Sequence, residues 1–278
     1  MSRLVLGTAQ WGTPYGITNS RGRLTDDDIV AIVSVARDRG INEIDTARGY
    51  GDAEIRLGPF ASQFAVTTKI TGDAAAKLQI ERSLEDLGIG RFDAVLVHDW
   101  EMLSEESCES VVRGLGEAHS AGLVDRVGVS IYSEAGVESA HQVFSALGVE
   151  LGALQVPANP LDRRLDDSPL LVELHAAGAQ IVVRSAFLQG VLLAEADRWT
   201  DHVDVRRFRA QVSEQGGTAV SACLGHVKAL PWATHVVVGV TTAAELSEIC
   251  EVWDECEPEL LPASLASADL ELIDPRQW

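Results

Sequence analysis

The chain has 278 residues, of which 46% are hydrophobic and 23% are charged. This composition is that of an ordinary soluble globular protein with a large core, and it excludes a disordered chain. The 22 Lys and Arg against 42 Asp and Glu give a formal net charge of −20. Because this charge would repel a phosphate backbone or an anionic membrane, we expect no nucleic-acid or membrane partner. No obligate protein partner is evident.

The four cysteines match no zinc-ligand spacing, and a chain of this size needs no disulfide staples. We therefore expect no metal site and reduced thiols. The amino terminus runs into strand-like sequence without an apolar leader, and no apolar stretch reaches the about 18 residues of a membrane span. These features predict a cytoplasmic protein. The cysteines are Cys108, Cys223, Cys250 and Cys256.

Short apolar runs alternate with amphipathic, helix-like stretches along the chain. After the first strand, Thr25 is expected to cap a helix that begins with three aspartates and closes at Gly40. The predicted strands are Leu4–Ala9, Glu43–Thr46, Ala65–Lys69, Ala94–His98, Val127–Ile131, Ala153–Val156, Gln180–Arg184 and His235–Val240. The later predicted helices are Asp73–Leu87, Glu105–Ser120, Glu134–Leu147, Ser168–Ala177 and Thr242–Trp253. Helix boundaries between Ala186 and Thr234 are not predicted.

Several predicted strands are apolar throughout, which is typical of a parallel sheet covered by helices on both faces. Eight strand-helix units in one chain favour a closed (β/α)8 TIM barrel, and no linker divides residues 1–278 into two domains. An open, doubly wound sheet is the alternative. The first strand-to-helix turn, Gly7–Gly12, lacks the glycine pattern of a dinucleotide fingerprint and so disfavours it.

Polar residues end three consecutive strands of this barrel. Asp45 ends the second strand and leads to Tyr50, Lys69 ends the third and His98 ends the fourth. Each residue alone is more commonly structural. Because the active site of such a barrel lies at the carboxyl ends of its strands, the four side chains are expected to meet in one volume.

The four residue types form a proton-transfer set. A phenol is a poor acid near neutral pH unless neighbours stabilise its anion. Lys69 is expected to lower the pKa of Tyr50, Asp45 to keep Lys69 charged and oriented, and His98 to hydrogen-bond the substrate oxygen or complete a proton path.

The order and spacing of these segments resemble the tetrad segments of the aldo-keto reductase superfamily. The resemblance implies that Tyr50 is the general acid that protonates a carbonyl as hydride arrives from a reduced nicotinamide, with Asp45, Lys69 and His98 in support. It extends over nearly the whole chain. The matching segments are Asp45–Gly51, Thr68–Lys69, Leu96–Asp99, Gly128–Ser130, Gln155–Asn159, Arg184–Gly190 and Gly239–Thr241.

The same resemblance implies the cofactor contacts. Ser130 and Gln155 would hold the nicotinamide carboxamide, and the start of the helix after Thr241 would receive the adenosine half, where free N–H groups favour phosphate. The remaining cofactor residues expected on this basis are Gly7, Thr8, Arg184, Ser185, Phe187, Leu188, Gln189, Gly190, Gly239 and Glu245.

Three departures from the family pattern concern the cofactor. Ile131 stands where many members have Asn, and Arg184 stands where many have a Tyr that stacks on nicotinamide. Thr242 and Glu245 occupy positions where NADP-preferring relatives offer Lys and Arg. Since a carboxylate near the 2′-phosphate is unfavourable, we hypothesise weaker NADP selectivity than usual. NADP(H) is the expected cofactor, and NAD(H) is the alternative.

The substrate side is expected to include Trp11 and Tyr15 after the first strand and Trp100 after the fourth, since aromatic rings at a barrel mouth stack on sugars or apolar groups. Resemblance of Leu6–Gly12 to a branch linked with sugar metabolism suggests a small, sugar-derived carbonyl compound.

Three other functions stay open at this stage. Lys69 could be a Schiff-base nucleophile of an aldolase, although Asp45 would favour its charged form. The chain could also be a redox-neutral epimerase that retains its nicotinamide, or a nucleotide-binding sensor without turnover.

Overall fold

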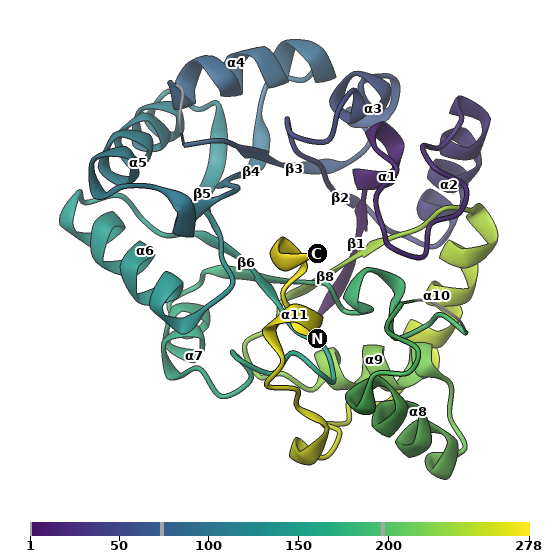
Figure 1. Ribbon diagram of the computed structural model, residues 1–278. Helices are drawn as coiled ribbons and strands as arrows, with labels where there is room; N and C mark the ends of the chain where they lie inside the picture. The colour runs from purple at the N-terminus through teal and green to yellow at the C-terminus, as the bar shows by residue number, and fades with distance from the viewer. Residues whose placement is uncertain (1, 73–74, 196–197) are drawn as a thin grey trace.

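Eight parallel strands close into a barrel in the computed structural model, which describes residues 2–72, 75–195 and 198–278. Neighbouring strands pair in chain order, and β8 closes the ring on β1 through the register Gly239 to Gly7 (Figure 1). The predicted TIM barrel is therefore confirmed. The strands are β1 Arg3–Gly7, β2 Glu43–Asp45, β3 Ala65–Ile70, β4 Phe92–Val97, β5 Val124–Ser130, β6 Ala153–Pro157, β7 Gln180–Arg184 and β8 His235–Gly239.

Helices surround the barrel, and the carboxyl-terminal segment ends near the middle of the barrel in this view (Figure 1). The α-helices are α1 Ala9–Gly12, α2 Asp26–Asp38, α3 Ala53–Ala61, α4 Ala76–Leu87, α5 Glu105–Ser120, α6 Glu134–Ala146, α7 Pro169–Ala176, α8 Val203–Gln215, α9 Ala219–Lys228, α10 Ala243–Glu255 and α11 Leu270–Ile273. Short 3-10 helices are η1 Trp100–Met102, η2 Leu188–Gly190, η3 Ala263–Leu265 and η4 Pro275–Gln277. No helix of the described residues is long and apolar enough to cross a membrane.

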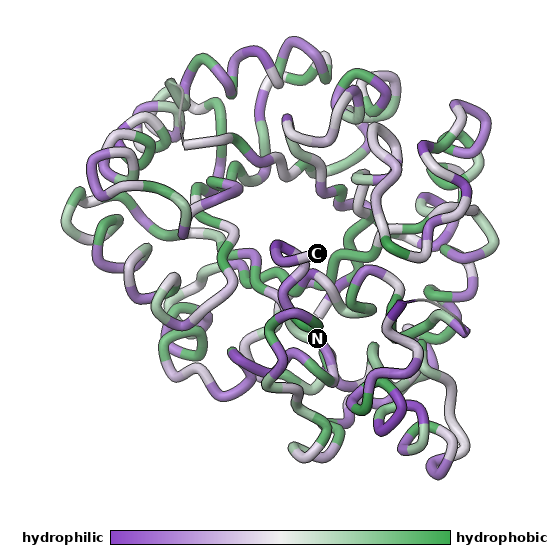
Figure 2. The backbone as a smooth tube through the Cα atoms, viewed as in Figure 1, coloured by the Kyte–Doolittle hydropathy of each residue, from purple (hydrophilic) through white to green (hydrophobic). Residues whose placement is uncertain are grey.

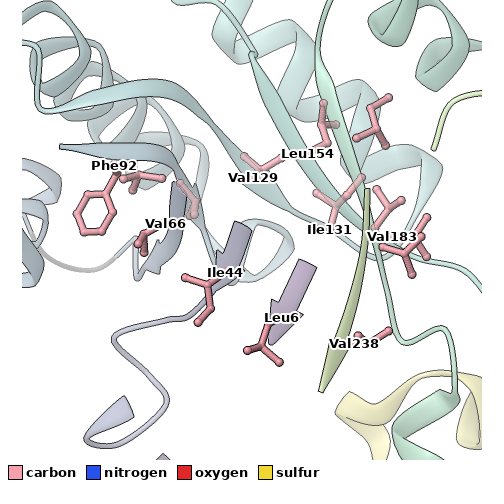
Figure 3. Packing of buried hydrophobic residues seen from close by; sticks show 14 of the residues in the cluster. Leu6, Ile44, Val66, Phe92, Val129, Ile131, Leu154, Val183 and Val238 are labelled. Carbon is pink, nitrogen blue, oxygen red and sulfur yellow. The ribbon is translucent and has the colours of Figure 1, made fainter. Parts of the chain in front are cut away.

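The main core lies between the barrel and its helices. Leu6, Ile44 and Val183 from different strands belong to this one cluster, and Figure 3 shows such side chains on successive strands. In β4, Val95 and Val97 join it. Hydropathy follows the same division, with hydrophobic segments along the strands and many hydrophilic segments on the outer helices (Figure 2).

The alternate residues of β4 face the barrel interior instead. Ala94 and Leu96 form a separate small cluster with Ala153 of β6, a strand that does not neighbour β4 in the sheet. Since side chains alternate along a strand, His98 lies on the same interior side as Leu96.

A second hydrophobic cluster joins α8, α9 and the tail, which is the segment after α10, residues 256–278. It contains Phe208 of α8, Cys223 of α9, and Leu272 and Ile273 of α11, all buried. The tail is thus anchored by its own apolar residues, and it is not a loose end of the chain.

The predicted helix ends follow the expected capping chemistry. The Thr25 hydroxyl accepts a hydrogen bond from the Asp28 N–H, and the Asp28 carboxylate accepts one from the Thr25 N–H, which completes a capping box. Gly40 and Gly88 take the left-handed conformation just after their helices.

Several predicted boundaries were wrong. β1 ends at Gly7 because Ala9 already starts α1, β4 ends at Val97 and β8 at Gly239. Helices α3, α8 and α9 were not predicted. The predicted start of the fourth helix at Asp73 lies outside the described residues.

Candidate active site

The carboxyl ends of β2, β3 and β4 bring Asp45, Lys69 and His98 together. Asp45 pairs in register with Gly7 and Thr67, and Lys69 pairs with Leu96. Asp45 and Lys69 are buried although both can carry a charge. A buried charge is costly unless it has a partner, so this pair needs direct contact.

The turn after β2 places Tyr50 beside them, and its conformation depends on two glycines. Gly51 has a φ of +61°, which favours glycine. A Cβ on Gly12 of α1 would lie 1.7 Å from the Tyr50 carbonyl oxygen, so α1 and this turn approach as closely as backbones can. The position of Tyr50 is therefore set by main-chain packing against α1.

The Lys69 ammonium donates to three oxygens. They are Asp45 Oδ1 at 2.5 Å, the Thr46 carbonyl at 3.1 Å and Tyr50 Oη at 3.4 Å. The other carboxylate oxygen of Asp45 accepts from Gln155 Nε2 at 2.8 Å. One continuous network thus joins the phenol, the ammonium, the carboxylate and the amide of β6.

The pKa values differ from the expected pattern. Burial, followed by the Asp45 charge, raises the pKa of Tyr50 above its ordinary value, while Arg184 opposes the rise. Burial also lowers the pKa of Lys69, against the opposing effect of Asp45. Desolvation therefore outweighs the nearby cations and the pKa of Tyr50 is raised overall, while the expected lowering by Lys69 stays a prediction. The phenol stays protonated at neutral pH.

His98 lies edge-on to the Tyr50 ring, with ring centroids 5.7 Å apart. Burial, followed by the charges of Lys69 and Arg184, lowers the pKa of His98 to about 3. The imidazole is neutral at physiological pH and can both donate and accept a hydrogen bond.

A cavity of about 470 Å³ opens above this network. Asp45 and Tyr50 line it, and so do many residues expected to bind cofactor or substrate. These are Gly7, Thr8, Tyr15, Gln155, Arg184, Ser185, Phe187, Gln189, Gly190, Gly239, Thr241 and Glu245.

Other expected residues lie behind the described cavity wall. Ser130 is buried and pairs in register with Gln155, and Leu188 is buried in the second cluster. Trp11 is fully buried in the main core, and Trp100 is buried against Phe144 with ring centroids 6.0 Å apart. The two indoles therefore act as packing residues here, which corrects their expected place at the substrate.

The cavity has features that fit a nicotinamide dinucleotide. Gln10, which was not among the expected contacts, is buried at its wall, and its Oε1 is a buried acceptor without a partner in the described structure. A Cβ on Gly239 would lie 2.7 Å from that amide, so a side chain at this position would fill this part of the cavity. Ser185 and Gln189 hold positive φ values of 59° and 52°, a strained conformation common at ligand sites.

The far end of the cavity is the start of α10. Thr242 caps the helix by accepting from the Glu245 N–H at 3.1 Å. The Glu245 carboxylate accepts from the Thr241 N–H at 2.7 Å and from its hydroxyl at 2.9 and 3.0 Å. A carboxylate thus already uses donors that would otherwise be free for a phosphate.

Metal-ligating clusters are absent from the residues that the structure describes: no group of three or more His, Cys, Asp or Glu could hold an ion. The four cysteines are free thiols.

The tail contacts residues next to the site, a feature that the sequence did not predict. Arg276 of η4 stacks on the Tyr132 ring at 3.8 Å and Arg184 does so at the same distance. Arg276 also pairs with Glu101 at 2.7 Å, and Glu101 accepts from the Ser133 hydroxyl at 2.6 Å. These contacts connect the tail with the loops after β4 and β5 and with the end of β7.

Comparison with known proteins agrees with this architecture. The model of the Aldo/keto reductase family matches residues 3–261. A Pseudomonas aeruginosa structure described as an aldo-keto reductase is 24% identical, with a TM-score of 0.69, and the match covers 92% of this chain and 90% of that one. The thermostable aldo-keto reductase Tm1743, solved with the inhibitor epalrestat, is 21% identical, with a TM-score of 0.70 and coverage of 95% and 93%. At these identities the likeness to both structures is one of fold. No curated protein matches the chain.

Proposed function

Because the chain belongs to the aldo/keto reductase family, we propose that it reduces an aldehyde or ketone to an alcohol, with Tyr50 as the proton donor. Enzymes of this family are oxidoreductases that use nicotinamide cofactors and act on small carbonyl compounds. The observation that carries the proposal is that Tyr50 lines the cavity while its Oη contacts Nζ of the buried Lys69 at 3.4 Å.

Each member of the tetrad has a chemical task in this proposal. Tyr50 is protonated at neutral pH and donates to the carbonyl oxygen as that oxygen gains charge, because an alkoxide is far more basic than a phenolate. Lys69 holds the Tyr50 oxygen, and Asp45 compensates the Lys69 charge. Neutral His98 hydrogen-bonds the same substrate oxygen. A bound reduced nicotinamide would supply the hydride.

The cavity residues divide along its length in the same proposal. Gln155 and the buried Ser130 would lie at the nicotinamide end, and Gly239, Thr241 and Glu245 at the adenosine end. Tyr15 is the remaining expected substrate contact. The four free thiols support a reducing compartment such as the cytoplasm.

Hydrogen bonding of Lys69 weighs against the aldolase alternative. An ammonium has three donors, and Asp45, Thr46 and Tyr50 accept all of them. A Schiff base needs a free amine lone pair, so it would require this network to break.

Removal of the phenol tests the proposed chemistry. Tyr50→Phe deletes the proton donor and keeps the ring, so we expect nearly all turnover to be lost while the cofactor Kd stays close to the wild-type value. Steady-state rates with a panel of neutral aldehydes and cofactor titrations by nicotinamide fluorescence measure the two quantities. A variant that keeps a tenth of the activity would sink the assignment of Tyr50.

We further propose that NADP(H) is the principal cofactor and that NAD(H) is accepted, because Glu245 would face the 2′-phosphate. The NADPH and NADH dissociation constants should differ by less than a hundredfold, and Glu245→Gln should shift their ratio about tenfold toward NADPH, since it removes about 1.4 kcal/mol of repulsion. NADPH binding at least a hundredfold tighter than NADH in the wild type contradicts this expectation.

A further inference from the structure

Arg184 is the last residue of β7, and its side chain reaches across the barrel mouth. It lines the cavity, and its guanidinium donates to the Ile131 carbonyl at 3.1 Å and to the Ser185 hydroxyl at 3.3 Å. The guanidinium carbon lies 3.8 Å from the centroid of the Tyr132 ring. The side chain therefore extends from β7 to the loop after β5.

The positive charge of Arg184 affects the pKa values of three tetrad residues. It opposes the rise in the pKa of Tyr50 and contributes to the lowered pKa values of Lys69 and His98. These groups come from the ends of three different strands. Arg184 and Tyr50 also line the same cavity, so the cation and the proposed proton donor can face one ligand.

Arg184 forms no salt bridge among residues 2–72, 75–195 and 198–278, since both of its hydrogen bonds go to neutral oxygens. Its charge also acts on Asp162, but that carboxylate is bonded to Arg164. The neighbouring cations are all paired. Lys69 pairs with Asp45. Arg164 and Arg276 share Asp274. Arg164 also pairs with Asp162, and Arg276 also pairs with Glu101. Of the two arginines that line the described cavity, Arg21 pairs with Asp28 and Arg184 has no salt bridge.

Aromatic stacking holds the guanidinium in one orientation. Arg184 and Arg276 each lie 3.8 Å from the Tyr132 centroid, which is van der Waals contact, so each occupies one face of the ring. Asp274 fixes Arg276 with two bonds of 2.9 and 2.6 Å. Of the five N–H donors of a guanidinium, Arg184 uses two inside the protein, which leaves three for a ligand.

We propose that Arg184 binds a carboxylate of the substrate, so that the enzyme prefers carbonyl compounds that carry an acid group a few bonds from the carbonyl. The inference rests on the proposed reductase function. A single guanidinium matches one monoanion in charge and in geometry. A cofactor phosphate is the less suitable occupant, because the proposed adenosine end of the cavity lies at Thr241 and Glu245. Arg184 instead donates to the carbonyl of Ile131, next to Ser130, which pairs in register with Gln155, and Gln155 donates to Asp45 of the tetrad.

A matched substrate pair tests the proposal. Rates are measured with 4-carboxybenzaldehyde and with its methyl ester, which has the same aldehyde and no charge, at saturating NADPH. We expect kcat/KM for the acid to exceed that for the ester at least tenfold in the wild type. In Arg184→Gln the ratio should fall to about one, mainly through KM, because the amide keeps polarity and loses the charge.

Two variants separate charge from structure. Arg184→Lys keeps a cation but loses the planar fork, so part of the acid preference should remain. Arg21→Gln removes another arginine of the cavity wall, one that already pairs with Asp28 at 2.8 Å, and should keep the wild-type ratio. A general loss of packing or a change in the Tyr50 pKa would change kcat/KM equally for the acid and the ester. Neither effect would therefore change the ratio of the two values.

Several outcomes overturn the proposal. A wild-type ratio near one does so, as does an Arg184→Gln variant that keeps the wild-type ratio. If Arg184→Gln weakens NADPH binding more than tenfold with an unchanged ratio, the residue serves the cofactor instead. A higher kcat/KM for 4-formylphenyl phosphate than for 4-carboxybenzaldehyde would contradict the assignment of a carboxylate as the ligand of Arg184. If the wild type reduces none of these aldehydes with either cofactor, the proposed reductase function fails first.

Discussion

His98 is the residue whose charge state the fold changes most clearly. Its pKa of about 3 lies well below the ordinary 6.5 because burial and two neighbouring cations disfavour the imidazolium. The unfolded chain gains a proton at this residue below about pH 6.5, while the folded protein does not until about pH 3. Acidification therefore favours the unfolded state, and stability is lost as the pH falls through this window.

The variant His98→Gln removes this pH dependence. One pKa unit corresponds to about 1.4 kcal/mol, so between pH 6 and pH 4 the free energy of unfolding should fall by about 2 kcal/mol more in the wild type than in the variant. Urea unfolding at both pH values measures the difference, which cancels the carboxylates common to both proteins. Parallel losses in the two proteins would show that His98 is protonated in the folded state.

At the scale of elements, the turn that carries Tyr50 depends on α1. A Cβ on Gly12 would lie 1.7 Å from the Tyr50 carbonyl oxygen and 2.7 Å from the Ala53 nitrogen, so both backbones would have to separate. Gly12→Ala should therefore displace the proton donor and lower kcat at least a hundredfold, with a loss of stability of about 1–3 kcal/mol. Turnover and thermal unfolding together measure the effect.

A control glycine makes that test specific. Gly90 lies just before β4, where an added Cβ meets no atom within 4 Å and the backbone does not require a positive φ. Gly90→Ala should keep wild-type activity. Equal activity of the Gly12→Ala variant and this control would show that the turn adapts, and that Tyr50 is not positioned through α1.

Prediction from sequence succeeded where an element carries its own signal. The strands of the barrel were predicted because their apolar runs end in polar residues, and Asp45, Tyr50, Lys69 and His98 gathered because strand order brings those ends together. Helix α3 was missed since Pro59 and Gly58 lie inside it. Pro at an interior position normally breaks a helix, so local propensity gave the wrong answer.

Other features depend on partners far away in the sequence. Helices α8 and α9 bury their apolar faces against Leu272 and Ile273 of the tail, so their boundaries cannot be predicted from the local pattern. Arg276 stacks on Tyr132, which is distant along the chain, and no sequence motif predicts this contact. For the same reason Trp11 and Trp100 looked like mouth residues but are packed in the core.

The whole molecule carries an excess of acidic residues, so many carboxylates have no basic residue to balance their charge. The net charge is −20, and most of the ion pairs have at least one side chain that is partly exposed, such as Arg91 with Asp125. Exposed pairs contribute little to stability, whereas like charges over the surface repel one another in the compact state. Screening should therefore weaken the repulsion more than it weakens the pairs.

Salt is accordingly expected to stabilise the protein at pH 7. The Debye length falls to about 10 Å at 0.1 M ionic strength, so raising NaCl from 20 to 300 mM should increase the free energy of unfolding by about 1 kcal/mol and Tm by about 2–4 °C. KCl should act equally if charge screening is the cause. Near the sequence pI of about 4.6 the net charge vanishes and the same salt increase should have no stabilising effect. A Tm that falls with salt at pH 7 would mean that the ion pairs outweigh the repulsion, and that the acidic surface is stabilised by its pairing.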